Sequence, residues 1–226
     1  TVIGKYGFIT IDPVTGEWKY TLFNGTDGEK GPVQSLAAGQ SVTEEFQLML
    51  NGEQQFRDGK PVVITITVQG TNDQPVITGT GAPKAIQESE TGGLNESVLT
   101  TPGKVDAHDI DYRLDSDGNP VTGANGEFQY QELEYYFLNE DGTHTYTLET
   151  KYGSIKINEK TGEYLYTVDL SKGEFDAYRS SDGKVHLTED QHLSDIINVY
   201  VNDGSNTVNA EAQSQITINI NGVNWK

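Results

Sequence analysis

The sequence predicts an all-β protein that consists of two Greek-key β-sandwiches in tandem, the first of them incomplete. Three observations support this fold class: short runs alternate polar and apolar residues, turn-forming residues separate these runs, and one long segment occurs twice. The 226 residues include 25 glycines and 12 tyrosines, a composition typical of strands connected by many turns. No segment has the spacing of a convincing amphipathic helix. The length allows one or two domains with a buried core.

An eighteen-residue segment occurs twice in the chain. It reads KYGFITIDPVTGEWKYTL at Lys5–Leu22 and KYGSIKINEKTGEYLYTV at Lys151–Val168, with ten identical residues. Self-similarity of this kind predicts an array of structural units. Arrays of stacked units more often span a distance or bind a partner than catalyse a reaction.

The first unit is expected to contain four strands. Within each of them, apolar residues recur at every second position, which is the period of a half-buried strand. These strands are expected at Tyr6–Ile11, Glu17–Leu22, Thr43–Leu50 and Val62–Gln69. A tight turn at Pro13–Gly16 separates the first two strands, and Thr161–Gly162 repeats this turn in the second copy.

A linker divides the chain into two units. The sequence QGTNDQP at Gln69–Pro75 interrupts strand pairing, because its Gly, Asn, Asp and Pro are turn formers and strand breakers. The predicted domains are therefore a partial repeat at residues 1–74 and a complete, enlarged repeat at residues 75–226. Strands of the second repeat are expected at 84–88, 97–108, 132–138, 153–157, 163–168, 195–202 and 213–221. Seven short strands separated by turns are typical of an immunoglobulin-like sandwich.

The two units match only in part. Val42–Asn51 corresponds to Leu193–Asn202, and Ile64–Val68 corresponds to Ile216–Ile220. The first unit thus matches the last four strands of the second, and its first three strands are expected upstream of Thr1. A partial sandwich has an open edge that favours pairing with another strand. We therefore expect the first unit either to pair with another chain or to stay loosely packed.

Composition excludes several classes of partner. The chain has 34 acidic and 15 basic residues and a formal net charge of −19, so it is not expected to bind nucleic acid or anionic lipid. Such a charge favours hard cations that prefer carboxylate oxygens. The absence of cysteine excludes disulfides and thiolate zinc sites. No run approaches the roughly 20 apolar residues of a membrane helix, so no membrane insertion is expected.

Three segments together resemble one known family. They read YGFITIDPVTGEWKYTL at 6–22, VQSLAAGQSVTEEF at 33–46 and ITITVQGTNDQPVI at 64–77. They resemble the VCBS repeat, a cadherin-like β-sandwich that occurs in tandem in large bacterial surface adhesins of the RTX type. The likeness is close over 6–77 and looser over 85–111 and 152–221. It implies a calcium-stiffened, adhesive or spacing role in cell adhesion and biofilm, and an extracellular location at the bacterial cell surface.

The candidate metal ligands are acidic residues near the linker. Calcium takes six to eight oxygen ligands, and Asp109 and Asp111 are expected to share one side of an extended segment. The resemblance to cadherins implies that a linker Asn-Asp and an acid of a later turn join this Asp-x-Asp pair. The alternative is that these are turn residues that need no metal. The predicted Ca²⁺ ligands are Asn72, Asp73, Asp109, Asp111, Asp203 and, at the far end of the second unit, Glu88.

A second function class stays open. Residues 114–131 form an insertion that the common repeat lacks, and 114–136 could serve a glycan- or peptide-binding module. Its aromatic residues are Phe128, Tyr130, Tyr135, Tyr136 and Phe137, and the alternative for them is packing in the core. No nucleophile elbow, phosphate loop or HExxH spacing is present, so no enzyme is expected. The expected partners are neighbouring repeats of the same chain and a cell-surface glycan or protein.

Overall fold

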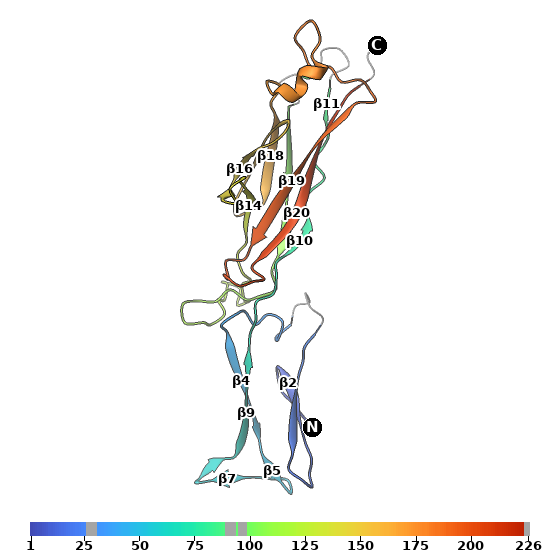
Figure 1. The fold of residues 1–226 in the computed structure, drawn as a ribbon. Coiled ribbons are helices and arrows are strands. Elements are labelled where there is room, and N and C mark those ends of the chain that lie inside the picture. Colours follow the sequence, from blue (N-terminus) through green and yellow to red (C-terminus); the bar gives the residue numbers. More distant parts are fainter. Residues whose placement is uncertain (26–30, 89–93, 95–98, 224–226) are drawn as a thin grey trace. The chain divides into compact units, whose positions relative to one another are not determined.

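A computed structural model describes residues 1–25, 31–88, 94 and 99–223 of the chain (Figure 1). Almost all of its regular secondary structure is β, which confirms the all-β class. The chain forms two compact units, and each is described by itself. The first unit contains Thr1–Asp73 and Asp109–Gln131, and the second contains Gln74–His108 and Glu132–Lys226. In the described ranges, no helix has both the length and the apolar character needed to cross a membrane.

The first unit contains one three-stranded sheet and several strand pairs. Its antiparallel sheet has the order β1 (Val2–Ile3), β2 (Gly7–Ile11) and β3 (Trp18–Leu22). The longest pair joins β4 (Ser41–Gln47) to β9 (Val63–Gln69), and two short pairs follow β4 in the chain. These are β5 (Met49–Leu50) with β6 (Glu53–Gln54), and β7 (Phe56–Arg57) with β8 (Lys60–Pro61). The four predicted strands are therefore confirmed, except that the third is split at Leu48 into β4 and β5.

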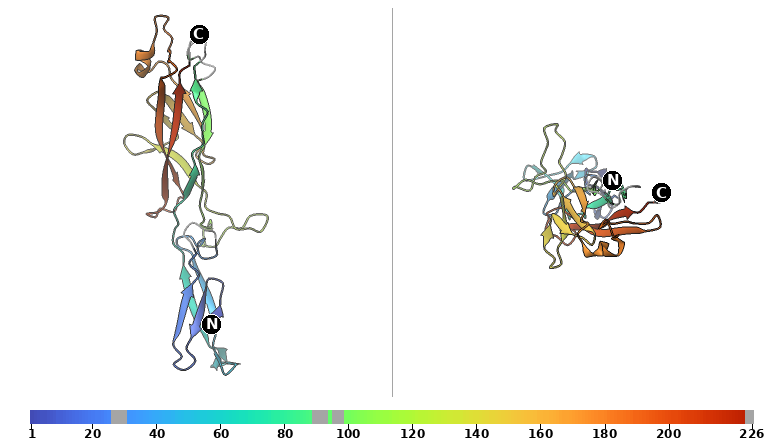
Figure 2. Two further views of the ribbon diagram at one scale, coloured as in Figure 1. Left: turned by 90° about the vertical axis from the view of Figure 1, so that its right-hand side faces the viewer. Right: turned by 90° about the horizontal axis from the view of Figure 1, so that it is seen from above.

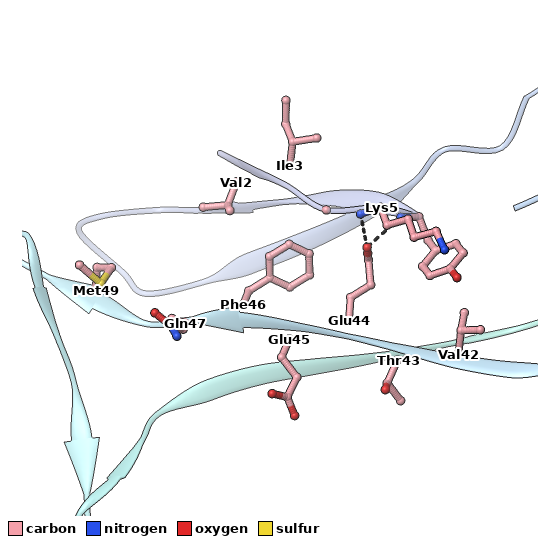
Figure 3. Close-up of a pocket in the computed structure, with 12 residues that line it drawn as sticks. Val2, Ile3, Lys5, Val42, Thr43, Glu44, Glu45, Phe46, Gln47 and Met49 are labelled. Carbon is pink, nitrogen blue, oxygen red and sulfur yellow. Dashed lines mark hydrogen bonds between the residues drawn. The ribbon is translucent and has the colours of Figure 1, made fainter. Parts of the chain in front are cut away.

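The core of the first unit is small. Its buried apolar cluster consists of Tyr6, Leu36 and Val68, with four partly buried residues packed against it. Large apolar side chains are exposed on the same unit, among them Val2, Ile3, Trp18, Phe23, Met49, Leu50 and Phe56. A cavity of about 830 Å³ lies between the chain at 2–6 and strand β4 (Figure 3). Within the described residues, much of the apolar face of this unit is therefore not covered.

The second unit contains two larger sheets. The first sheet has the order β11 (Ile86–Gln87), β20 (Glu211–Asn221), β19 (His192–Asn202), β14 (Glu134–Leu138) and β15 (His144–Thr145). The second sheet has the order β12 (Thr100–Lys104), β18 (Glu163–Val168), β17 (Gly153–Ile157) and β16 (Thr147–Glu149). A separate pair joins β10 (Val76–Gly79) to β13 (Asp106–His108), and a 3-10 helix, η2, spans Gly173–Tyr178. Figure 2 shows these elements from two further sides.

The core of the second unit lies between its two sheets. Every second residue of β18 is buried, and the same alternation runs through β19, so each strand turns one face inward. Tyr166 and Ile155 from one sheet join Phe137, Val199 and Ile218 from the other in one continuous apolar cluster. Burial of this apolar surface is the main force that holds the two sheets together.

The duplicated segment folds into the same turn twice. The side chain of Asp12 accepts hydrogen bonds from the backbone N–H groups of Val14 and Thr15, at 2.7 and 3.0 Å. Asn158 makes the same two bonds to Lys160 and Thr161, at 2.9 and 3.0 Å. Each turn ends on a glycine in the left-handed region, Gly16 with φ 75° and Gly162 with φ 70°. Only glycine adopts this conformation without steric cost, which explains the repeated Thr-Gly.

The strands around these turns also correspond. Strands β2 and β3 pair in the same register as β17 and β18, and the β4–β9 pair corresponds to β19–β20. In the second unit, β12 pairs with β18, β14 pairs with β19, and β11 runs parallel to β20. Among the described residues of the first unit, β3, β4 and β9 have no such partners at the corresponding edges.

One expected strand of the second unit is divided. The prediction at 97–108 becomes β12 and β13, and residues 97–98 lie outside the described ranges. Val105 separates the two strands: its side chain is buried, and its N–H donates to the carbonyl of Gly162 at 2.9 Å. Before Val105, strand β12 pairs with β18; after it, strand β13 pairs with β10. Strands β10, β15 and β16 and helix η2 were not predicted, because such short elements carry too little periodicity to detect.

Candidate functional site

The predicted Asp-x-Asp pair follows directly after strand β13. Asp109 and Asp111 are both buried, with 4% and 0% of their surface exposed. The backbone N–H of Asp111 donates to Oδ1 of Asp109 at 2.7 Å, so the segment turns locally and brings the two side chains into one buried region. Burying a carboxylate is costly unless hydrogen bonds or positive charge compensate for the lost hydration. Two buried carboxylates in one short segment are therefore an unusual feature of this acidic chain.

The linker reaches the same place from the other side of the sequence. The backbone N–H of Asp73 donates to Oδ2 of Asp111 at 2.8 Å, across 38 positions in the chain. Asn72 is buried beside it, and its Nδ2 donates to the carbonyl of Asp73 at 2.7 Å. The structure thus brings together four of the predicted ligands, Asn72, Asp73, Asp109 and Asp111, within the first unit.

A glycine and a loop hold this arrangement in place. The N–H of Gly70 donates to the carbonyl of Gln40 at 2.9 Å, and a Cβ at Gly70 would collide with the carbonyl groups of Leu36 and Ala37. Only glycine lets the linker run so close to the loop. After Asp111, the N–H of Tyr112 donates to the carbonyl of Ser35 at 3.2 Å. The same loop therefore supports both segments that carry the acidic side chains.

The donor set fits calcium in kind. All four residues offer oxygen atoms, and three of them offer carboxylates, which are the ligands that Ca²⁺ prefers. In the parts of the chain that the structure describes, no group of three or more His, Cys, Asp or Glu side chains is arranged to hold a metal ion. The geometry shows donors gathered on two segments that are hydrogen-bonded to each other. It does not show an assembled coordination shell.

The other two predicted ligands belong to the second unit. Asp203 is buried in the turn between β19 and β20, where its Oδ1 accepts from the N–H of Ser205 at 2.7 Å. The buried carboxylate of Glu88 accepts from the N–H of Leu187 at 2.7 Å and lies 3.1 Å from Nδ1 of His186. Glu88 is thus engaged in protein contacts of its own, and the metal role assigned to both acids stays a prediction.

An acid in each unit, Glu44 in the first and the buried Asp195 in the second, was not predicted as a site. In the first unit, Glu44 on β4 accepts hydrogen bonds from the N–H groups of Lys5 and Tyr6 (Figure 3), and it also accepts one from the hydroxyl of Tyr20. The bond from Tyr6 measures 2.8 Å, as does the bond from Tyr20. The carboxylate therefore ties the start of β2, strand β3 and strand β4 together.

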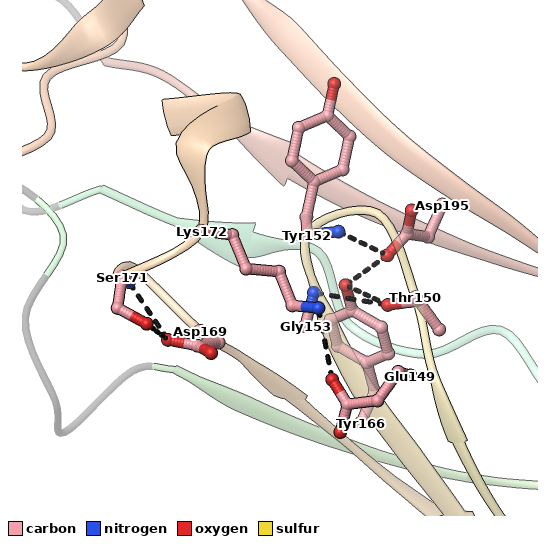
Figure 4. A network of polar contacts seen from close by, with 9 residues as sticks. All are labelled: Glu149, Thr150, Tyr152, Gly153, Tyr166, Asp169, Ser171, Lys172 and Asp195. Atoms are coloured by element: carbon pink, nitrogen blue, oxygen red, sulfur yellow. Dashed lines mark hydrogen bonds and ion pairs between the residues drawn. The ribbon is translucent and has the colours of Figure 1, made fainter. Parts of the chain in front are cut away.

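The second unit repeats this network with an aspartate. Asp195 on β19 accepts from the N–H of Tyr152 at 3.2 Å and from the hydroxyl of Tyr166 (Figure 4). The hydroxyl of Tyr166 also lies 3.3 Å from Oγ1 of Thr150. Each partner occupies the position of its counterpart in the duplicated segment, so Tyr6 and Tyr20 correspond to Tyr152 and Tyr166. The sequence offered one sign of these networks. Glu44 and Asp195 are acids at matching positions of the corresponding segments Val42–Asn51 and Leu193–Asn202.

Burial and these carboxylates change the acidity of the tyrosines. Burial is the larger cause that raises the pKa of Tyr166, and the hydrogen bond to Asp195 raises it further. Tyr20 has its pKa raised by the same two causes, with Glu44 as the acid. Both phenols therefore keep their proton, and both act as hydrogen-bond donors to an acid. Each network therefore joins strands of its unit through hydrogen bonds to one carboxylate.

The aromatic group around the insertion is divided between the units. Tyr135, Tyr136 and Phe137 are buried in the second unit, which confirms the packing alternative for them. Phe128 and Tyr130 belong to the first unit, where Tyr112 lies against both rings. Phe128 is 46% exposed, and it lines a cavity of about 360 Å³. Of the predicted aromatic residues, two therefore face a recess on the first unit.

The chain is similar to a known protein over part of its length. No family model matches the chain. A stretch of 81 residues is 31% identical to chondroitin sulfate proteoglycan 4 from Homo sapiens and covers 35% of this chain. The chain spans only 4% of the length of that proteoglycan.

Proposed function

We propose that this chain is a calcium-stiffened structural and adhesive repeat module of a large bacterial surface or secreted adhesin. Its units would be immunoglobulin-like or cadherin-like sandwiches of the VCBS type. Two observations support the repeat character: the same Asx-stabilised turn occurs at Asp12 and Asn158, and the flanking hairpins have the same register. The partial similarity to a human proteoglycan agrees with an extracellular setting.

The observation that carries the calcium proposal is the bond between Asp73 and Asp111. It joins the linker to the Asp-x-Asp segment at 2.8 Å and places Asn72, Asp73, Asp109 and Asp111 in one region of the first unit. Carboxylates gathered in this way repel each other and lose hydration when buried. Bound Ca²⁺ would supply the compensating positive charge and prefers these oxygen ligands. The four residues would then hold the linker Thr71–Pro75 in one conformation.

The proposed mechanism is mechanical, and it depends on contacts between the linker and the residues around it. Asp111 receives the linker N–H of Asp73, and Gly70 lets the linker lie against the loop at 36–40. Neutralising the carboxylates would lower the free energy of this closed arrangement relative to an open linker. An open linker would loosen one of the three backbone connections between the units, the one at 73–74, and a closed linker would hold it in place.

Calcium addition to chelator-treated protein tests this function. Binding is expected to raise the free energy of unfolding by about 2.7 kcal/mol when free calcium is 100 times its dissociation constant. Small-angle scattering with calcium and with chelator should differ in the spread of chain dimensions. Identical scattering curves together with no calorimetric binding would contradict the proposal.

A matched pair of variants makes the test specific. The double variant Asp109→Asn with Asp111→Asn should lose calcium binding, because it removes two charged ligands. Asp12→Asn removes a charge elsewhere in the same unit and should bind calcium normally. Asp12→Asn is expected to change the fold little, because Asn158 accepts the same turn hydrogen bonds in the second copy.

A further inference from the structure

A recess on the first unit lies between the loop at 31–40 and the inserted hairpin at 112–131. Its volume is about 360 Å³, which is in the range of small-ligand sites. Tyr6, Tyr112, Phe128 and Tyr130 supply an aromatic lining, and Lys5 and Gln40 supply polar groups. All of these residues belong to the first unit. The recess is separate from the residues proposed to hold calcium, none of which lines it.

The inserted hairpin builds the aromatic wall. The segment folds back on itself more than once, through bridges that pair Tyr112 with Tyr130, Leu114 with Pro120 and Thr122 with Phe128. The ring centroid of Tyr112 lies 4.8 Å from that of Phe128 and 5.6 Å from that of Tyr130. The hairpin therefore holds three rings as one cluster, and exposed aromatic clusters of this kind are more typical of binding surfaces than of ordinary solvent-facing hairpins.

Gln40 provides an independent sign of a ligand. Its side chain is buried, with 5% of the residue exposed, and in the described structure its Oε1 accepts no hydrogen bond. A buried amide oxygen without a donor is unfavourable, and native proteins rarely retain one without a reason. Gln40 also lines the recess, and a turn of its side chain would bring the buried oxygen to a bound molecule that supplies the missing donor.

The second copy of the repeat shows that this turn does not by itself leave the glutamine side-chain oxygen without a hydrogen-bond donor. Gln191 occupies the corresponding position, and its Oε1 accepts from the N–H of Thr188 at 2.8 Å. The backbone contacts are the same in both copies: the N–H of Gln40 donates to Ala37 at 3.0 Å, and the N–H of Gln191 donates to Thr188 at 2.8 Å. The two glutamines thus differ in their side chains only. In the first unit, the amide oxygen is left for another donor.

We propose that this recess binds a neutral sugar. A sugar ring presents a C–H face that packs on aromatic rings, and its hydroxyl groups can donate to Oε1 of Gln40 and accept from Nζ of Lys5. The net charge of −19 disfavours sulfated or carboxylated glycans. A proline-rich peptide also suits aromatic grooves, but proline has no N–H to satisfy the glutamine. This binding goes beyond the spacer function and does not depend on calcium.

The test uses the full chain and an array of neutral glycans. The array carries terminal glucose, galactose, mannose, fucose and N-acetylhexosamines, together with sulfated glycans and proline-rich peptides. The best neutral glycan is then titrated in solution by calorimetry, with calcium and with chelator. We expect a neutral glycan to bind in both conditions, so failure of the calcium proposal would leave this result unchanged.

Variants locate the binding site. Gln40→Leu and Phe128→Ala are expected to weaken binding by roughly tenfold or more, the effect of losing a buried hydrogen bond or a stacking surface. Gln191→Leu at the matching position and Trp18→Ala at an exposed aromatic outside the recess should bind as the unmodified chain does. Phe128→Trp should retain binding because it keeps an aromatic face. Circular dichroism of each variant verifies that it folds.

Several results would overturn the proposal. One is that no neutral glycan binds at millimolar concentration. Another is that Gln40→Leu and Phe128→Ala, folded, bind as well as the two controls. A third is that only the sulfated glycans or the proline-rich peptides bind. If Gln40→Leu did not fold, chemical-shift changes at Tyr112 and Tyr130 on glycan addition would decide, and their absence would count against the recess.

Discussion

The hydroxyl of Tyr166 donates a hydrogen bond to the buried carboxylate of Asp195 in the second unit. Tyr20 and Glu44 form the same bond in the first unit, at 2.8 Å. In both cases the acid also accepts the N–H of the tyrosine at the second position of the duplicated segment, Tyr6 or Tyr152. These bonds join strand β4 to the β2–β3 hairpin in the first unit and strand β19 to the β17–β18 hairpin in the second. The bond is thus a connection between sheets as well as a local contact.

Removing the hydroxyl of Tyr166 is expected to destabilise the second unit. Tyr166→Phe takes one donor from a buried carboxylate, which costs about 1–3 kcal/mol in the free energy of unfolding. Tyr164→Phe on the same strand is the matched control, because the hydroxyl of Tyr164 donates to a neutral carbonyl, that of Thr80, at 2.8 Å. Denaturant titration should give the smaller loss for the control. An equal loss in both variants would mean that the charge of Asp195 has no special role.

Stability is expected to fall at alkaline pH. Burial raises the pKa of Tyr164 to about 12, above its ordinary value of 10. A raised pKa means that the folded state favours the protonated phenol, so this contribution is fully present below pH 10 and is lost as pH rises toward 12. Tyr164→Phe cannot titrate and should show a shallower decline over that range. A decline of the same slope in both proteins would contradict this assignment.

Two glycines in equivalent turns should differ in their tolerance of alanine. Gly16 and Gly162 have φ of 75° and 70°, so an alanine at either position is strained. Left-handed backbone costs an alanine about 1–2 kcal/mol. A Cβ at Gly162 would also collide with the carbonyl of Val105 and the ring of Tyr135, whereas at Gly16 no atom of the described residues lies within 4 Å of such a Cβ. Native-state hydrogen exchange, read separately for each unit, should show a clearly larger loss for Gly162→Ala.

The uncovered face of the first unit should promote association between chains. Among its described residues, β3, β4 and β9 lack the partners that β12, β14 and β11 provide in the second unit. Exposed strand edges and apolar side chains favour pairing with another chain. We expect sedimentation velocity to show association that increases with protein concentration.

A charge on that face should prevent this association. Ile3 is 75% exposed on β1 and lines the cavity beside the unpaired strand β4, so Ile3→Lys adds a positive charge next to that strand. Ile196→Lys is the control, because Ile196 is an exposed isoleucine on a strand of the second unit. Strictly monomeric behaviour of the unmodified chain at high concentration would refute the prediction, as would equal effects of the two variants.

Much of the strand content could be predicted from the sequence. Strands β17 and β18 coincide with the ranges expected from alternation, and β19 and β20 differ only at their first residues. These strands are buried on one face, and a one-sided environment enforces the period of two in the sequence. Strands β1, β6, β7 and β8 of the first unit were missed because two residues cannot show a period.

The candidate sites were only partly predictable for a different reason. The approach of the linker at Asp73 to Asp111 was expected from the order of the motifs, and the metal role of both residues stays a prediction. The position of Gln40 in a recess was not, because it depends on how residues 112–131 fold back onto a loop about 70 positions earlier. The acids Glu44 and Asp195 were also missed. Their partners are 38 and 43 positions away, and sequence alternation does not report such distant contacts.

The backbone passes between the two compact units three times, at 73–74, at 108–109 and at 131–132. A protease cut at residues 71–75 would therefore leave the two units joined. The hairpin at 112–131 would stay covalently attached to the second unit and would hold the N-terminal fragment through contacts such as that of Tyr112 with Ser35. Such a nicked molecule would still sediment as one particle, and its two fragments would separate only in denaturant.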